Sequence, residues 1–185
     1  FPGYTDRKKT EEKIIHDAFT KGDRWFNTGD MLGNMGFRHA RFADRLGDTF
    51  RWKGENVATM EVEKIINSFA GVSSSAVYGV AMPSGDGKAG MAAIIREENA
   101  HIDLAALVSH LRSSLPAYAI PLFLRFVDDF QWTATFKLKK TGLKDEGFDP
   151  QRVEGGVYVL LPGGSSYVRM DEAVHRDLMA GKYRF

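Results

Sequence analysis

The segment DRLGDTFRWKGEN, residues 44–56, combines residue types that suggest a chemical role. It places six charged side chains, two glycines, a phenylalanine and a tryptophan in thirteen positions. This mixture suits neither a buried strand nor an ordinary solvated turn. Three further segments draw attention in the same way: WFNTGD at 25–30, LPAYAIP at 115–121 and TATFKLKK at 133–140. Together they supply carboxylate, guanidinium and ammonium groups, which accept from or donate to hydroxyls and phosphates.

Other polar patterns in the chain predict no metal site. The five histidines do not fall in a paired ligand spacing such as HxxxH, so each is expected to be a surface or capping residue. They stand at positions 16, 39, 101, 110 and 175. The absence of cysteine excludes disulfides, thiolate metal sites and a cysteine nucleophile, and it fits a reducing compartment.

Two short runs have an ordinary structural interpretation beside a functional one. GDGK at 85–88 lacks the other residues of a phosphate-binding loop, because Met82 stands where glycine is needed and Ala89 follows the lysine. A hairpin turn is the better interpretation. KLKK at 137–140, taken alone, is typical of the solvated start of a helix.

Length and charge limit the class of protein. The 185 residues are 43% hydrophobic and 26% charged, enough for one sizeable core or for a core with a fragment attached. A net charge of +1 does not provide a basic face for nucleic acid, so we expect no nucleic-acid partner. No apolar run reaches the roughly 18 residues of a membrane span. Because the first residue is phenylalanine, we expect the chain to be the tail of a longer protein.

Hydrophobic periodicity predicts the elements that would position these segments. TEEKIIHDAF, residues 10–19, predicts a first helix, and short extended pieces follow it. Residues 58–71 predict an amphipathic helix capped by Thr59, and residues 103–115 predict a helix capped by Asp103. Strands are expected in SSAVYGVAM, GMAAIIREE, LFLRFVDDF and VYVLL. Residues 135–147 and 171–181 are expected to add two helices.

The order of these elements predicts an α+β domain from about residue 45 onward. The four segments, in their order and spacing, resemble the C-terminal part of the adenylate-forming enzymes. That superfamily includes acyl-CoA synthetases, peptide-synthetase adenylation domains and luciferases. DTFRWKGENVAT together with TATFK and the tail GFDP is similar to the branch of fatty-acid transport proteins and very-long-chain acyl-CoA synthetases. The resemblance implies a small mixed sheet flanked by helices, which is the mobile C-terminal domain of these enzymes.

The resemblance also implies a chemistry for three residues. These enzymes convert a carboxylate and ATP into an acyl-adenylate and pyrophosphate, and coenzyme A then displaces AMP. Asp30 would accept hydrogen bonds from the ribose hydroxyls, and Arg45 would contact ribose and phosphate. Lys137 would be the catalytic lysine that stabilises charge at the α-phosphate. The alternative for Asp30 and Arg45 is a surface ion pair.

The same resemblance assigns a hinge and a second reactive face. Leu46, Gly47 and Asp48 would form the hinge about which the small domain rotates between the two half-reactions. The face for thioester formation with coenzyme A would hold three residues of the opening segment, namely Arg51, Gly54 and Glu55. Phe50 and Trp52 are equally well interpreted as packing anchors and as coenzyme A contacts.

We therefore expect residues 1–44 to be the end of an N-terminal AMP-binding domain and residues 45–185 to be the C-terminal domain. The expected function is that of a long or very-long-chain fatty acyl-CoA synthetase, an acid-thiol ligase, of which this fragment alone is inactive. Another adenylate-forming ligase and a non-catalytic fatty-acid uptake module are the alternatives.

The expected ligands are the substrates of that reaction. They are a fatty acid, ATP or AMP, and coenzyme A, with Mg²⁺ bound through the N-terminal domain, which is also the expected partner. The expected location is the cytoplasm, with peripheral membrane contact left open.

Overall fold

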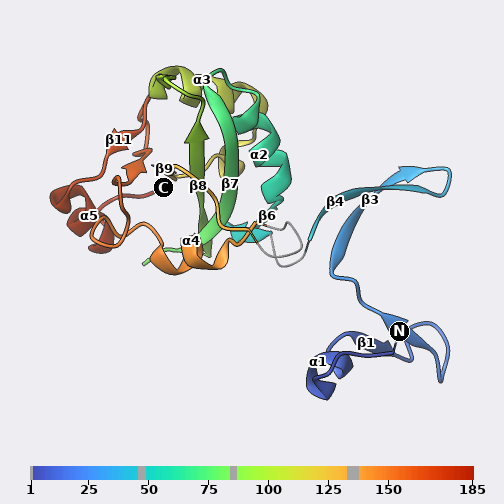
Figure 1. The fold of residues 1–185 in the computed structure, drawn as a ribbon. Coiled ribbons are helices and arrows are strands. Elements are labelled where there is room, and N and C mark those ends of the chain that lie inside the picture. The colour runs from blue at the N-terminus through green and yellow to red at the C-terminus, as the bar shows by residue number, and fades with distance from the viewer. Residues whose placement is uncertain (1, 46–48, 84–86, 133–137) are drawn as a thin grey trace. The chain divides into compact units, whose positions relative to one another are not determined.

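A computed structural model describes residues 2–45, 49–83, 87–132 and 138–185 (Figure 1). The chain divides into two compact units, Phe1–Gly47 and Asp48–Phe185. None of the helices within the described ranges is long and apolar enough to cross a membrane. The assignment of the first unit to an N-terminal domain stays a prediction.

The first unit consists of a short helix and two antiparallel hairpins. Helix α1 spans Arg7–Glu11, and strands β1 (Ile14–His16) and β2 (Arg24–Phe26) pair with each other. Strands β3 (Asp30–Gly36) and β4 (His39–Arg45) form the second hairpin. Phe37 and Arg38, which connect them, both have positive φ (49° and 63°), as the two central residues of a type I′ turn do.

The predicted helix over residues 10–19 is wrong. Asp6 caps α1 earlier in the chain, where its carboxylate accepts the N–H groups of Lys8 and Lys9. Ile14 and Ile15 lie in β1, because β-branched side chains favour extended backbone. The Asp23 carboxylate then accepts the backbone N–H groups of Ala18, Phe19 and Thr20, which holds residues 18–23 in a turn.

The second unit is built on a five-stranded mixed sheet with the order β11-β10-β9-β8-β7. Strands β8 (Lys88–Arg96) and β9 (Phe123–Phe126) are parallel, and the other neighbours are antiparallel. The remaining strands of the unit are β5 (Phe50–Trp52), β6 (Glu55–Val57), β7 (Val72–Ala81), β10 (Tyr158–Val159) and β11 (Val168–Arg169). The predicted α+β class with a small mixed sheet is confirmed.

Part of the helix predicted over residues 135–147 is wrong, because residues 138–140 are not helical and Leu138 pairs with Trp132 in an antiparallel bridge. The described helices of this unit fall within the predicted ranges. They are α2 (Thr59–Asn67), α3 (Leu104–Ser114), α4 (Thr141–Glu146) and α5 (Glu172–Met179), with a 3₁₀ turn at Ala117–Ala119. Helix α2 runs along β7 (Figure 1). The apolar stripe of α2 buries Val62 and Ile66, and that of α3 buries Leu107, Val108 and Leu111.

The two predicted helix caps have different outcomes. Asp103 caps α3, since its carboxylate accepts the N–H groups of Ala105 and Ala106. Thr59 does not cap α2, because Ala58 holds the cap position and Thr59 is the first residue of the helix. The Thr59 side chain is buried and makes a different contact, which is described below.

Phe50 closes the core beneath the β5–β6 hairpin. Gly79 and Gly90 are partners in the β7–β8 register. A Cβ atom added to Gly79 would lie 2.5 Å from the Cβ of Phe50, and one added to Gly90 would lie 3.0 Å from its Cζ. The paired glycines therefore make room for the aromatic ring, and Phe50 is only 5% exposed.

Candidate functional site

The antiparallel register brings Asp30 and Arg45 opposite each other. Asp30 is the first residue of β3, Arg45 is the last residue of β4, and their Cα atoms are partners. Such partners lie about 4.5–5.5 Å apart. Asp30 is half-buried, whereas Arg45 is described by its backbone alone. Residues fifteen positions apart in the sequence therefore lie on neighbouring strands, and their binding roles stay predictions.

The turn before β3 fixes the start of that strand. The Asn27 side chain accepts the N–H of Gly29, and the Thr28 hydroxyl accepts the N–H of Asp30. Gly29 has φ +76°, a conformation that glycine adopts without a Cβ penalty. The side chains of the NTGD sequence therefore fix Asp30 at the open end of the β3–β4 hairpin.

The predicted thioester face lies on the β5–β6 hairpin. Lys53 and Gly54, with φ 51° and 85°, form its two-residue turn. Arg51 and Glu55 are exposed, whereas Phe50 and Trp52 are 5% and 4% exposed. The alternation along β5 thus directs Arg51 to solvent and uses both aromatic residues as packing anchors.

A cavity of about 290 Å³ lies beside this hairpin. Its lining includes Trp52, Leu160 and Phe185, with the cations Lys53 and Arg112. The Lys53 ammonium lies 5.9 Å from the centroid of the Trp52 ring, and Arg112 donates to the carbonyl of Gly164. An apolar wall with cations suits a ligand that has an apolar body and an anionic group.

The predicted catalytic lysine and hinge lie outside the described residues. Lys137 belongs to the range 133–137, and Leu46, Gly47 and Asp48 form the range 46–48. The residues on either side of 133–137 are described. Trp132 and Leu138 form an antiparallel bridge, and the N–H of Lys139 donates to the carbonyl of Gln131 at 2.7 Å.

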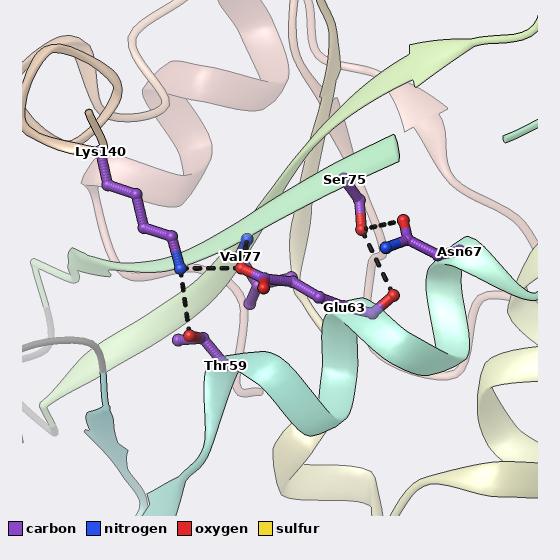
Figure 2. A network of polar contacts seen from close by, with 6 residues as sticks. All are labelled: Thr59, Glu63, Asn67, Ser75, Val77 and Lys140. Carbon is purple, nitrogen blue, oxygen red and sulfur yellow. Dashed lines mark hydrogen bonds and ion pairs between the residues drawn. The ribbon is translucent and has the colours of Figure 1, made fainter. Parts of the chain in front are cut away.

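A polar network next to this segment connects α2, β7 and the start of α4 (Figure 2). The Lys140 ammonium lies 2.7 Å from Glu63 Oε1 and donates to the Thr59 hydroxyl at 3.1 Å. Glu63 Oε1 also accepts the backbone N–H of Val77 at 2.8 Å. Sequence reasoning missed this network, because KLKK taken alone is typical of the solvated start of a helix. Lys139 is exposed and Lys140 is not, and the helix begins after both, at Thr141.

A second ion pair lies at the other end of α4. Arg125 of β9 pairs with Glu146, and the Arg125 side chain is 7% exposed. Tyr78 of β7 is fully buried nearby, and burial raises its pKa well above the usual range although the Arg125 guanidinium lowers it in part. Charged groups therefore attach the start of α4 to helix α2 and its end to strand β9.

In the described ranges, no group of three or more His, Cys, Asp or Glu residues is placed to hold a metal ion. The binding of Mg²⁺ by another part of a longer protein stays a prediction.

Comparisons with known proteins identify the family. Residues 61–137 match the family model of the AMP-binding enzyme C-terminal domain. The chain is 46% identical over 168 residues to "Medium/long-chain-fatty-acid--CoA ligase FadD6" of Mycobacterium tuberculosis. It is 44% identical over 171 residues to "Long-chain fatty acid transport protein 6" of Mus musculus. These matches cover 91% and 92% of this chain, and the chain spans 28% of the length of each relative.

A solved structure agrees with the sequence matches. ATP-bound MatB from Rhodopseudomonas palustris superposes with a TM-score of 0.67 and 27% identity, over 78% of this chain and 28% of MatB. The resemblance drawn from the sequence is thereby confirmed. The chain contains the AMP-binding enzyme C-terminal domain and is a member of the adenylate-forming superfamily, with relatives among the fatty-acid transport proteins and fatty-acid–CoA ligases.

Proposed function

We propose that this chain is the C-terminal part of an ATP-dependent long or very-long-chain fatty acyl-CoA synthetase. In the first half-reaction a fatty acid carboxylate attacks the α-phosphate of ATP and releases pyrophosphate. In the second, the thiol of coenzyme A attacks the acyl carbonyl and releases AMP. The match of residues 61–137 to the C-terminal domain, together with 46% identity to a fatty-acid–CoA ligase, carries the proposal.

The first half-reaction would use Asp30, Arg45 and Lys137. A carboxylate has two oxygens that can accept hydrogen bonds from neighbouring ribose hydroxyls, and Arg45 supplies a planar donor fork. The register that makes Asp30 and Arg45 partners supports a shared nucleotide contact. Lys137 would place an ammonium against the negative charge that gathers on the phosphate oxygens.

The second half-reaction would use the opposite face of the domain. Rotation about Leu46, Gly47 and Asp48 would move Lys137 away from the adenylate. The same rotation would bring the β5–β6 hairpin to it. The exposed Arg51 and Glu55, and the positive φ of Gly54, support a turn that is open to a ligand. A glycine backbone without Cβ permits close approach of a pantetheine chain.

The ligands and partners follow from this reaction. They are a fatty acid, ATP and coenzyme A, the N-terminal part of the same protein, and Mg²⁺ bound through that part. We propose a cytoplasmic location for the full-length protein.

The names of several relatives favour a second candidate, a fatty-acid uptake module without catalysis. Long-chain fatty acid transport proteins 6 and 1 of Mus musculus share 44% and 42% identity with this chain. A pure uptake module has no need for Asp30, Arg45 and Lys137 together. The presence of all three residues in this chain therefore favours the ligase.

The test is product analysis with the full-length protein. ATP, Mg²⁺ and coenzyme A are supplied with a long-chain fatty acid, a short-chain acid, an aryl acid or an amino acid in separate reactions. We expect acyl-CoA and equimolar AMP with the long-chain acid. Product from a different acid class alone would assign the other type of ligase. Fatty-acid binding without AMP release would support the uptake module.

A further inference from the structure

We propose that Lys140 and Glu63 are positioning residues for adenylation. Their ion pair fixes the C-terminal side of the segment that carries Lys137 to helix α2 and strand β7. The inference rests on the proposed function, because it takes Lys137 as the lysine of the first half-reaction.

The ion pair is largely buried, and at such a position a gain in stability does not by itself explain an ion pair. The side chains of Lys140 and Glu63 are 13% and 18% exposed, so both charges have lost most of their water. A buried ion pair often contributes no more stability than apolar residues of similar size. What a pair at 2.7 Å does provide is a defined geometry, because the two charged groups satisfy each other only in that arrangement.

The position of Lys140 in α4 supports this interpretation. Lys140 holds the N-cap position of the helix and makes no side-chain capping hydrogen bond. Ser, Thr, Asp or Asn would be favoured there, and a cation is disfavoured by the positive end of the helix dipole. The side chain instead points away from α4 to Thr59 and Glu63 on α2 (Figure 2).

Glu63 is itself held in place by the sheet. The same Oε1 atom that contacts Lys140 accepts the backbone N–H of Val77 in β7. One turn further along α2, the Asn67 side-chain oxygen accepts the hydroxyl of Ser75 at 2.7 Å (Figure 2). The anchor point for Lys140 is therefore part of the packed contact between α2 and β7.

The anchor lies close to Lys137 along the chain. Lys140 lies three positions after Lys137, a span of at most about 11 Å. Between them, Leu138 bridges to Trp132 and Lys139 donates to Gln131, so every residue from 138 to 140 is held. Loss of the ion pair releases one of these attachments. A misplacement of about 1 Å at a reacting group can lower a rate about 100-fold.

The experiment compares the two half-reactions in the full-length protein. Adenylation is followed as pyrophosphate exchange, and thioester formation is followed from supplied acyl-adenylate and coenzyme A. We expect Lys140→Met and Glu63→Gln each to lower the kcat of adenylation about 10- to 100-fold and to leave thioester formation nearly unchanged. The double variant should be no worse than either single variant, because both remove the same contact.

Two further variants separate positioning from a general structural effect. Lys140→Arg retains a cation that can pair with Glu63, so it should restore most of the adenylation rate. Lys182→Met removes another lysine–carboxylate pair of the same length, the exposed contact with Asp177 at 2.7 Å, and should change neither half-reaction.

The outcomes distinguish this inference from the proposed function. Two results would contradict the positioning role, provided that wild type performs both half-reactions. In the first, Lys140→Met and Glu63→Gln keep wild-type rates of adenylation and thioester formation. In the second, they lower both rates by the same factor. Failure of Lys140→Arg to restore adenylation contradicts it as well. A wild-type protein that performs neither half-reaction overturns the proposed function, and the inference with it.

Discussion

Lys139 and Lys140 show that neighbouring residues of one type can lie in different environments. Lys139 is exposed, whereas Lys140 contacts Glu63 and is largely buried. A run of lysines in the sequence does not reveal this difference, because the partner of Lys140 lies 77 residues away. The resemblance to the superfamily, and not the run itself, assigns the catalytic role to Lys137.

The proposed role of Lys137 predicts an unequal effect on the two half-reactions. In the full-length protein, Lys137→Ala should lower adenylation about 10²–10³-fold, which is typical for the loss of one preorganised charge donor. Thioester formation from supplied acyl-adenylate should persist, because the assigned role ends when pyrophosphate leaves. Pyrophosphate exchange and thioester release measure the two steps.

Lys139→Ala is the matched control for this variant. It removes the same charge from the same segment, from a side chain that the structure exposes. We expect both half-reactions to keep their wild-type rates. Equal losses from Lys137→Ala in both half-reactions would contradict the assigned role.

At the scale of elements, the packing of β5 on β7 and β8 predicts a cost in stability. In Gly79→Ala the new Cβ would lie 2.5 Å from the Cβ of Phe50, so strand or ring must shift. Such overpacking costs about 1–3 kcal/mol of unfolding free energy. Urea unfolding of the 185-residue chain, followed by circular dichroism, measures the loss.

Gly142→Ala is the control for added bulk at a glycine. Gly142 lies in α4, and an added Cβ would have open space around it. Alanine favours a helix over glycine by about 0.5–1 kcal/mol, so this variant should be at least as stable as wild type. Wild-type stability of Gly79→Ala would show that Phe50 does not pack as described.

The cap of α3 predicts an acid dependence. The N–H groups of Ala106 and Ala105 lower the pKa of Asp103 below its usual value of 3.8. The unfolded chain therefore binds the proton more tightly, so this contribution to stability is present above about pH 3.8 and is lost as the pH falls through the folded pKa.

Asp103→Asn tests this dependence, because asparagine can cap the helix and does not titrate. The difference in melting temperature between wild type and variant should shrink as the pH is lowered from about 6 to about 2. A difference that stays constant over that range would exclude the titration of Asp103 as a source of acid sensitivity.

Sequence patterns predicted the elements of the second unit well and those of the first unit poorly. Val62 and Ile66, like Leu107 and Leu111, have the spacing of a helix that packs on a sheet, and the structure buries them. Ile14 and Ile15 have part of that spacing. Their segment nevertheless pairs as a strand, because the Asp23 carboxylate stabilises a local turn that competes with helix.

The sequence predicts residues of the candidate site only where they lie close together along the chain or where the resemblance to the superfamily is specific. The Lys53-Gly54 turn places the hairpin residues Arg51 and Glu55 within one short segment. The contact between Lys140 and Glu63 is different, since it depends on how α4 packs beside α2. No sequence spacing encodes such a contact, because it forms only when the whole sheet is assembled.

At the scale of the whole molecule, the assigned hinge predicts that the two half-reactions can be separated by one substitution. Proline fixes φ near −65° and removes a backbone donor, so Gly47→Pro should stall rotation between the two faces. If the full-length variant is trapped in the adenylation state, it should retain pyrophosphate exchange and lose coenzyme A-dependent product. Trapping in the other state reverses this pattern. Wild-type rates in both steps would require another pivot.

The proposed function also predicts that neither this chain nor the remaining part of the full-length protein catalyses a half-reaction alone. This chain spans 28% of the length of its relatives, and the nucleotide and acyl pockets are expected in the remaining part. The C-terminal unit, Asp48–Phe185, would contribute Lys137 and the hairpin with Arg51. Each half-reaction should therefore require both parts.

The most direct test is ATP-dependent acyl-CoA formation by three proteins: the full-length protein, the 185-residue chain alone, and the full-length protein without residues 48–185. The readout is acyl-CoA and AMP from a long-chain fatty acid and coenzyme A. We predict product from the full-length protein only. Acyl-CoA formation at a comparable rate by either partial protein would contradict the account.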